Sequence, residues 1–123
     1  MKIIKLTPRK ALNKAFLKVK PIRSEIDTFK KNFVTLLDSI NPEESEEFHK
    51  NLAAEFLRKT YYNNIFFINT SGNIDLVIHM GKEASTPVGA LMEFKRPQNK
   101  EEMISTDNLN AKAFHELIPL LSG

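Results

Sequence analysis

The sequence predicts a fold of the α/β class, more narrowly α+β. Helices are expected to pack on a small mixed sheet that contains an antiparallel β-meander. Three observations predict it: two segments with helical spacing of apolar residues come first, three strand-like segments with short connections follow, and another helical segment comes last. The chain has 123 residues, of which 41% are hydrophobic and 27% charged. This composition is typical of one globular domain.

Apolar residues recur at three- and four-residue spacings over residues 24–39, which predicts the first helix. The second helix is predicted to begin at Asn41, which suits an N-cap, with Glu44 completing a capping-box spacing. The last helix is predicted over residues 107–118, where Pro119 interrupts the pattern.

Segments rich in β-branched and aromatic residues predict strands at Ile65–Asn69, Ile74–Met80 and Val88–Lys95. Residues 70–73 have strong turn chemistry, and a longer loop at 81–87 joins the second pair. Connections this short predict antiparallel pairing between consecutive strands.

Charge is concentrated near the N-terminus. Residues 1–31 hold ten Lys or Arg and two acidic residues, so we expect a basic arm at 1–21 ahead of a domain at 22–123. Such an arm can contact phosphate without sequence preference, although a solvated basic tail without a partner has the same composition.

Several classes of protein are excluded by composition. The chain has no cysteine, so disulfides, thiolate metal sites and cysteine nucleophiles are absent. No stretch approaches the ~18 apolar residues of a membrane helix, and the N-terminus lacks the apolar core of a signal peptide. We therefore expect a cytoplasmic protein without a membrane partner.

The hairpin made by the second and third predicted strands carries the candidate chemistry. Pairing symmetric about Ala84 places Asp75 opposite Glu93, and opposed residues share a sheet face. Alternation along the strand adds Lys95 to that face and turns Phe94 to the other. The spacing therefore predicts a cluster of two carboxylates and a lysine.

Two facing carboxylates repel each other unless a cation lies between them. Carboxylate oxygens from Asp75 and Glu93, with the main-chain carbonyl of Phe94, suit Mg²⁺, which keeps several waters and completes its shell with substrate phosphate. Lys95 beside such a metal could orient or deprotonate the attacking water, or stabilise growing negative charge.

Residues 73–78 followed by 91–95 resemble the signature of the PD-(D/E)XK nuclease superfamily. The longer run from Phe48 to Leu117, with Glu93–Pro97 and Asn108–Ala113, resembles the N-terminal nuclease region of fused type IIG restriction and modification enzymes. Ile74 stands where that family often has proline.

The resemblance implies a restriction-endonuclease-like core and hydrolysis of double-stranded DNA with Mg²⁺, or Mn²⁺ as a substitute. Asp75 and Glu93 would bind the metal, and Lys95 would be the catalytic lysine. An acidic residue from the first core helix often joins such sites, and Glu47 and Glu55 are both candidates. The closing strand of that core has no counterpart, because residues 119–123 are too short and broken.

The resemblance also implies a prokaryotic restriction-modification system, with methyltransferase and target-recognition domains or subunits as partners; a homodimer is compatible with it. Arg96, Lys100 and Lys112 are candidate DNA contacts, for which plain surface roles are about equally compatible. The alternative function is a catalytically inactive module on the same scaffold, which binds DNA or a methyltransferase.

Other conspicuous residues have structural explanations. We expect His79 to be a hydrogen-bonded histidine on the Asp75 face rather than a ligand. The acidic cluster at residues 43–47 is expected to interact with its helix dipole. Packing at the junction of helix and strand explains the remaining aromatic pairs better than base stacking does: Tyr61, Tyr62, Phe66 and Phe67.

Overall fold

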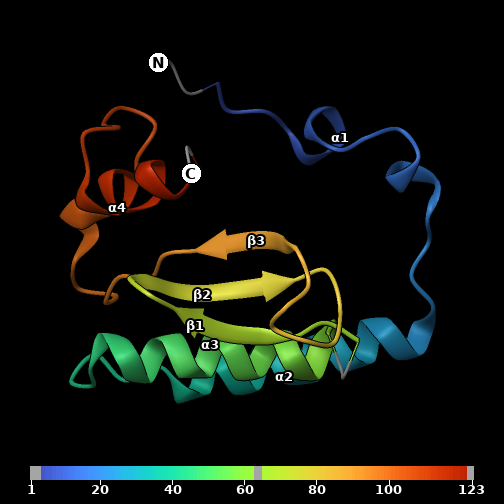
Figure 1. The fold of residues 1–123 in the computed structure, drawn as a ribbon. Coiled ribbons are helices and arrows are strands. Elements are labelled where there is room, and N and C mark those ends of the chain that lie inside the picture. The colour runs from blue at the N-terminus through green and yellow to red at the C-terminus, as the bar shows by residue number, and fades with distance from the viewer. Residues whose placement is uncertain (1–3, 63–64, 122–123) are drawn as a thin grey trace.

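A computed structural model describes residues 4–62 and 65–121, and these form the predicted α+β class of fold (Figure 1). Two long helices precede a three-stranded sheet, and a further helix follows the sheet. In chain order the elements are α1 (Pro8–Ala11), η1 (Phe16–Lys18), α2 (Arg23–Ser39), α3 (Glu46–Thr60), β1 (Ile68–Ser71), β2 (Ile74–His79), β3 (Val88–Met92), η2 (Lys100–Glu102) and α4 (Lys112–Leu121).

The sheet is an antiparallel meander in the order β1-β2-β3. Leu76 pairs with Met92 and Val77 with Leu91, which is the register predicted from symmetry about Ala84. Gly72 makes the tight β1–β2 turn with φ of 57°, a conformation that costs glycine little. Both strand pairings in the described part of the chain are antiparallel, so the predicted mixed sheet is wrong for this part.

The core lies between α3 and one face of the sheet. Ala54 from α3 packs with Ile68, Leu76 and Ile78, all of which are buried. Figure 1 shows α2 and α3 together on one side of the sheet. Val77 points to the opposite face and is fully buried, so β2 is covered on both sides.

The start of α3 differs from the prediction because two caps compete. The Ser45 hydroxyl accepts a hydrogen bond from the Phe48 backbone N–H at 3.1 Å, so the helix begins at Glu46 rather than after Asn41. The Asn41 side chain instead accepts from the Glu43 N–H and closes a separate turn. A side chain that can cap can equally form such a turn.

The last helix also begins later than predicted. The Ser105 hydroxyl accepts from the Asn108 N–H at 3.0 Å, and the Asn108 side chain accepts from the Asn110 N–H at 2.9 Å. These turns hold residues 105–110 out of the helix, and α4 begins at Lys112. Pro119 lies inside α4 and does not end it, contrary to the prediction.

Two strand boundaries differ as well. The strand predicted from Ile65 begins at Ile68, although Phe67 still exchanges backbone hydrogen bonds with Gly81 and His79. The strand predicted to reach Lys95 ends at Met92. Beyond Met92, a hydrogen bond from the Phe94 backbone N–H to the Asp75 side chain takes the place of strand pairing.

The basic arm is exposed at every residue from 4 to 22 and contains only the short helices α1 and η1. Figure 1 shows it as an extended segment, set apart from the sheet, that leads into α2. Among the described residues, no helix is long and apolar enough to cross a membrane.

Candidate active site

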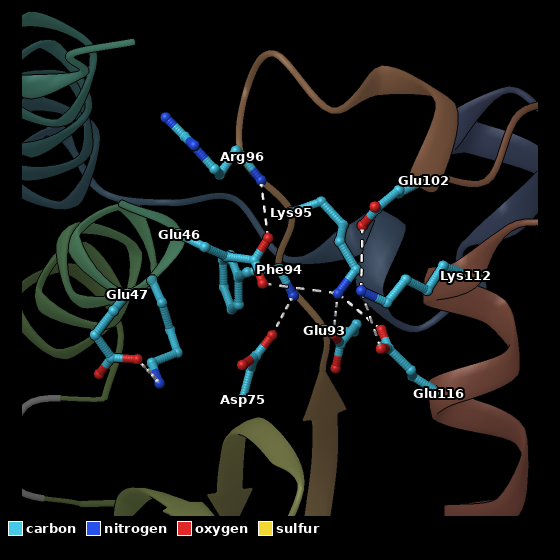
Figure 2. Close-up of polar contacts among 11 residues, drawn as sticks. Glu46, Glu47, Asp75, Glu93, Phe94, Lys95, Arg96, Glu102, Lys112 and Glu116 are labelled. Atoms are coloured by element: carbon cyan, nitrogen blue, oxygen red, sulfur yellow. Dashed lines mark hydrogen bonds and ion pairs between the residues drawn. The ribbon is translucent and has the colours of Figure 1, made fainter. Parts of the chain in front are cut away.

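Asp75, at the start of β2, holds the segment that follows β3. Its Oδ2 accepts a hydrogen bond from the Phe94 backbone N–H at 2.9 Å (Figure 2). This N–H therefore donates to a side chain and not to a neighbouring strand, which explains why regular pairing stops at Met92. The contact brings Glu93 and Lys95 to the end of the hairpin where Asp75 lies.

Lys95 is the centre of a buried ion cluster. Its side chain is 3% exposed, and its Nζ lies 2.5 Å from Glu93 Oε1, 2.7 Å from Glu116 Oε2 and 3.8 Å from Glu46 Oε1. The carboxylates come from the segment after β3, from α4 and from α3, and Figure 2 shows them pointing toward the ammonium. We call Lys95, Glu93, Glu116 and Glu46 the Lys95 cluster. A buried ammonium is tolerated only with such compensation.

Burial and hydrogen bonding in the cluster shift the pKa values of Glu93 and Lys95 from their ordinary values. Burial raises the pKa of Glu93 to about 7, against the hydrogen bond from Lys95, and Glu116 and Asp75 act in the same direction as burial. Burial disfavours the charged form of Lys95, but hydrogen bonds with Glu116 and Glu93 raise its pKa above the ordinary value. Lys95 is therefore a cation at neutral pH, while Glu93 titrates near neutrality.

Glu46 and Glu116 were missed by the sequence analysis. Besides facing Lys95, Glu46 accepts a hydrogen bond from the Arg96 backbone N–H at 3.2 Å, which joins α3 to the segment after β3. Sequence reasoning assigned Glu46 only an interaction with the helix dipole and assigned Glu116 no role. No signal in the sequence distinguishes Glu116 from other acidic residues on helix surfaces.

Glu47 and Glu55, the two candidates for an additional acidic ligand from the first core helix, form ion pairs outside the cluster. Glu47 forms an ion pair with Lys50, and Glu55 with Lys59. Figure 2 shows Glu47 pointing away from the Lys95 cluster. From α3, the side chain brought to Lys95 is that of Glu46.

Two of the three candidate DNA contacts, Arg96 and Lys112, adjoin residues of the cluster. The Arg96 guanidinium donates to the Pro42 carbonyl at 3.3 Å. Lys112 Nζ lies 3.6 Å from Glu102 Oε2 and 3.9 Å from Glu116 Oε1. Lys100 is exposed in η2. Arg96 therefore lies on the α3 side of the cluster, and Lys112 lies on α4 beside Glu116.

The donor set fits magnesium better than zinc. Within residues 4–62 and 65–121, no group of three or more Asp, Glu, His or Cys side chains is arranged to hold a metal. The predicted ligands Asp75, Glu93 and the Phe94 carbonyl would supply two carboxylates and one neutral oxygen. Mg²⁺ commonly binds through one or two carboxylates, with waters and substrate phosphate completing its shell.

His79 is not part of this donor set. Its Nδ1 lies 2.9 Å from the Thr86 carbonyl oxygen and its Nε2 3.0 Å from Asn69 Oδ1, and the residue is buried. Both ring nitrogens have partners, as expected for a structural histidine.

Fold and site together define an α+β domain with a buried lysine and carboxylate cluster at one end of a β-hairpin. The chain belongs to the family described as domain of unknown function (DUF7149), whose model matches residues 6–120. Neither the curated proteins nor the solved structures gave a match. That family description names no activity.

Proposed function

We propose that this chain is a Mg²⁺-dependent DNA endonuclease domain of a restriction-modification system, which hydrolyses phosphodiester bonds in double-stranded DNA. The observation that carries the proposal is the convergence of Asp75, Glu93 and Lys95 at one end of the hairpin. The resemblance of the same residues to the PD-(D/E)XK signature, and with it a restriction-endonuclease-like core, supports it.

Asp75 and Glu93 would hold the metal, with the Phe94 carbonyl as a further ligand. The hydrogen bond from Phe94 uses one oxygen of Asp75 and orients the carboxylate. Bound Mg²⁺ would polarise the phosphoryl group and neutralise the leaving oxygen. The Glu93 side chain is only 5% exposed. Electrostatic interactions at the site are therefore stronger than they would be in water.

Lys95 would act as a cation rather than as a base. Its raised pKa keeps the ammonium charged at neutral pH. A charged lysine cannot deprotonate water, but it can orient the attacking water by hydrogen bonding and stabilise negative charge on the phosphoryl oxygens. Glu116 and Glu46 are positioning residues, because they act through Lys95.

Partners follow from the same proposal. Double-stranded DNA is the substrate, and methyltransferase and target-recognition domains or subunits would supply modification and specificity. Arg96, Lys100 and Lys112 would be contacts to phosphates of the DNA backbone. A prokaryotic cytoplasm is the compartment that this role requires.

One observation favours the alternative, an inactive scaffold that binds DNA or a methyltransferase. The Lys95 ammonium is already engaged by three carboxylates, and such a cluster can serve purely to join α3, the hairpin and α4. In that case the cluster contributes to folding and not to catalysis.

The test combines calorimetric titration of Mg²⁺ and Mn²⁺ with nicking of supercoiled plasmid. Asp75→Asn should abolish metal binding and lower nicking by at least about 100-fold. Lys95→Met should lower nicking while metal binding persists. Asp38→Asn, an exposed aspartate on α2, is the matched control and should behave like the wild type.

The possible results separate the two functions. Metal binding and nicking that both require Asp75 support the nuclease. Metal binding without nicking supports the inactive scaffold. A folded wild-type chain that binds neither metal would refute the proposed metal site.

A further inference from the structure

A cavity of about 340 Å³ lies at the C-terminal end of α3, the opposite end of this helix from Glu46. Its lining combines three cations with three aromatic rings: Arg58, Lys59, Lys82, Tyr62, Phe66 and Phe67. We propose that this cavity, the Arg58 pocket, binds a nucleotide unit, either free or within single-stranded nucleic acid. The base would lie against the rings and the phosphate against the cations.

The charges of the pocket suit a phosphate. Among the described residues that line it, none is acidic. Arg58 Nη2 donates to the Ile68 carbonyl at 3.1 Å, which fixes the guanidinium while its other N–H groups stay available for an anion. Lys59 pairs with Glu55, but both side chains are more than half exposed, and such surface pairs are weak enough for a phosphate to compete.

The rings suit a base. Phe66 and Phe67 keep 37% and 36% of their surface exposed, so the expectation that they simply pack at the junction of helix and strand is wrong in part. Tyr62 meets Phe66 edge-on with ring centroids 5.6 Å apart, and Phe67 lies 5.7 Å from the His79 ring. These contacts hold the rings in place, and every base has a face that can stack on such a surface.

The pocket is separate from the Lys95 cluster. Arg58 lies about 18 Å along α3 from Glu46, at a rise of about 1.5 Å per residue. Binding there requires neither metal nor hydrolysis. The proposal can therefore be tested in EDTA, and its failure would leave the proposed nuclease site untouched.

The experiment is fluorescence anisotropy with a labelled oligothymidylate of about 12 nucleotides, a length within the range for single-strand sites. Lys82→Ala should weaken binding about three- to tenfold and reduce the salt slope by about 0.7. Phe66→Leu should weaken binding about tenfold, and Phe66→Tyr, which keeps the ring, should restore it. Lys30→Ala removes an exposed charge on α2 and should leave the affinity unchanged.

Circular dichroism of each variant confirms folding before binding is compared. Affinity unchanged by both Lys82→Ala and Phe66→Leu overturns the proposal. So does a wild-type chain that binds neither the oligonucleotide nor thymidine monophosphate, or a loss with Lys82→Ala that Phe66→Leu does not share. Displacement of the oligonucleotide by the monophosphate identifies a nucleotide site; the expected variant losses without displacement identify the strand as the ligand.

Discussion

Replacing Lys95 with methionine removes the cation of the Lys95 cluster while keeping a similar side-chain length. Glu93 and Glu116 then face each other without the ammonium that lies 2.5 and 2.7 Å from their oxygens. Removing one partner of a buried ion pair costs about 3–5 kcal/mol. Glu116 is 36% exposed, so water screens part of the effect, and we expect the free energy of unfolding to fall by about 3 kcal/mol at pH 8.

The loss should depend on pH. Without the lysine, the carboxyl of Glu93, whose pKa is already about 7, gains a proton more readily, and protonation removes the repulsion. At pH 5.5 we expect the loss to shrink to about 1 kcal/mol, within the range for neutral hydrogen bonds. Urea unfolding followed by circular dichroism at the two pH values measures both losses.

Lys50→Met is the matched control. The Lys50 side chain is also buried, 9% exposed, but its partner Glu47 is 63% exposed and can be hydrated. The free energy of unfolding that Lys50→Met loses should be nearly the same at the two pH values. If Lys95→Met costs less than about 1 kcal/mol at pH 8, or costs the same at both pH values, the carboxylates do not depend on the ammonium and the reasoning is refuted.

Three further predictions concern other parts of the molecule. The pKa of Glu93 is raised from 4.5 to about 7, so the stability that Glu93 contributes is full below pH 4.5 and is lost as pH rises through 7; Glu93→Gln should flatten this decline in urea-unfolding profiles. Ser45→Ala removes the cap of α3 and should cost about 1 kcal/mol in the same assay. Mg²⁺ at ten times its Kd should stabilise the fold by about 1.4 kcal/mol in thermal unfolding, and Asp75→Asn should abolish this gain.

Each of these has an opposing result. A profile that keeps its decline in Glu93→Gln would assign the pH dependence to another group. A Ser45→Ala chain as stable as the wild type would mean that water replaces the cap. Equal stabilisation of wild type and Asp75→Asn by Mg²⁺ would place the binding of this ion elsewhere.

The hairpin was the part of the site that could be predicted from the sequence. Alternation of apolar residues and a central loop determine both the face and the register of an antiparallel pair. The pairing of Val77 with Leu91 confirms that register, and as a consequence Asp75 contacts the segment that carries Glu93 and Lys95.

Helix boundaries were less predictable because several side chains compete for the same backbone donors. Asn41 and Ser45 both suit an N-cap, and the sequence does not reveal that Asn41 closes a separate turn. The same competition, between the Ser105–Asn110 turns and a helical start at Asp107, delayed α4.

The roles of Glu46 and Glu116 depend on how distant elements pack. Each lies on a helix surface where an acidic residue is ordinary, and neither has a local pattern that distinguishes it from Glu47 or Glu55. Only the docking of α3 and α4 beside the end of β3 brings them to Lys95. Local periodicity carries no information about that placement.

The Lys95 cluster also has a consequence for the order of folding. Glu46 and Arg96 are 50 residues apart in sequence, whereas the helices and the hairpin form through local contacts. Closing a long loop costs more conformational entropy than forming a local element. Contacts between residues distant in sequence therefore form late in folding. The cluster is complete only when α3, the hairpin and α4 have docked, and a chain still emerging from the ribosome before Glu116 lacks it. Chemistry at this site would therefore begin only in fully folded molecules.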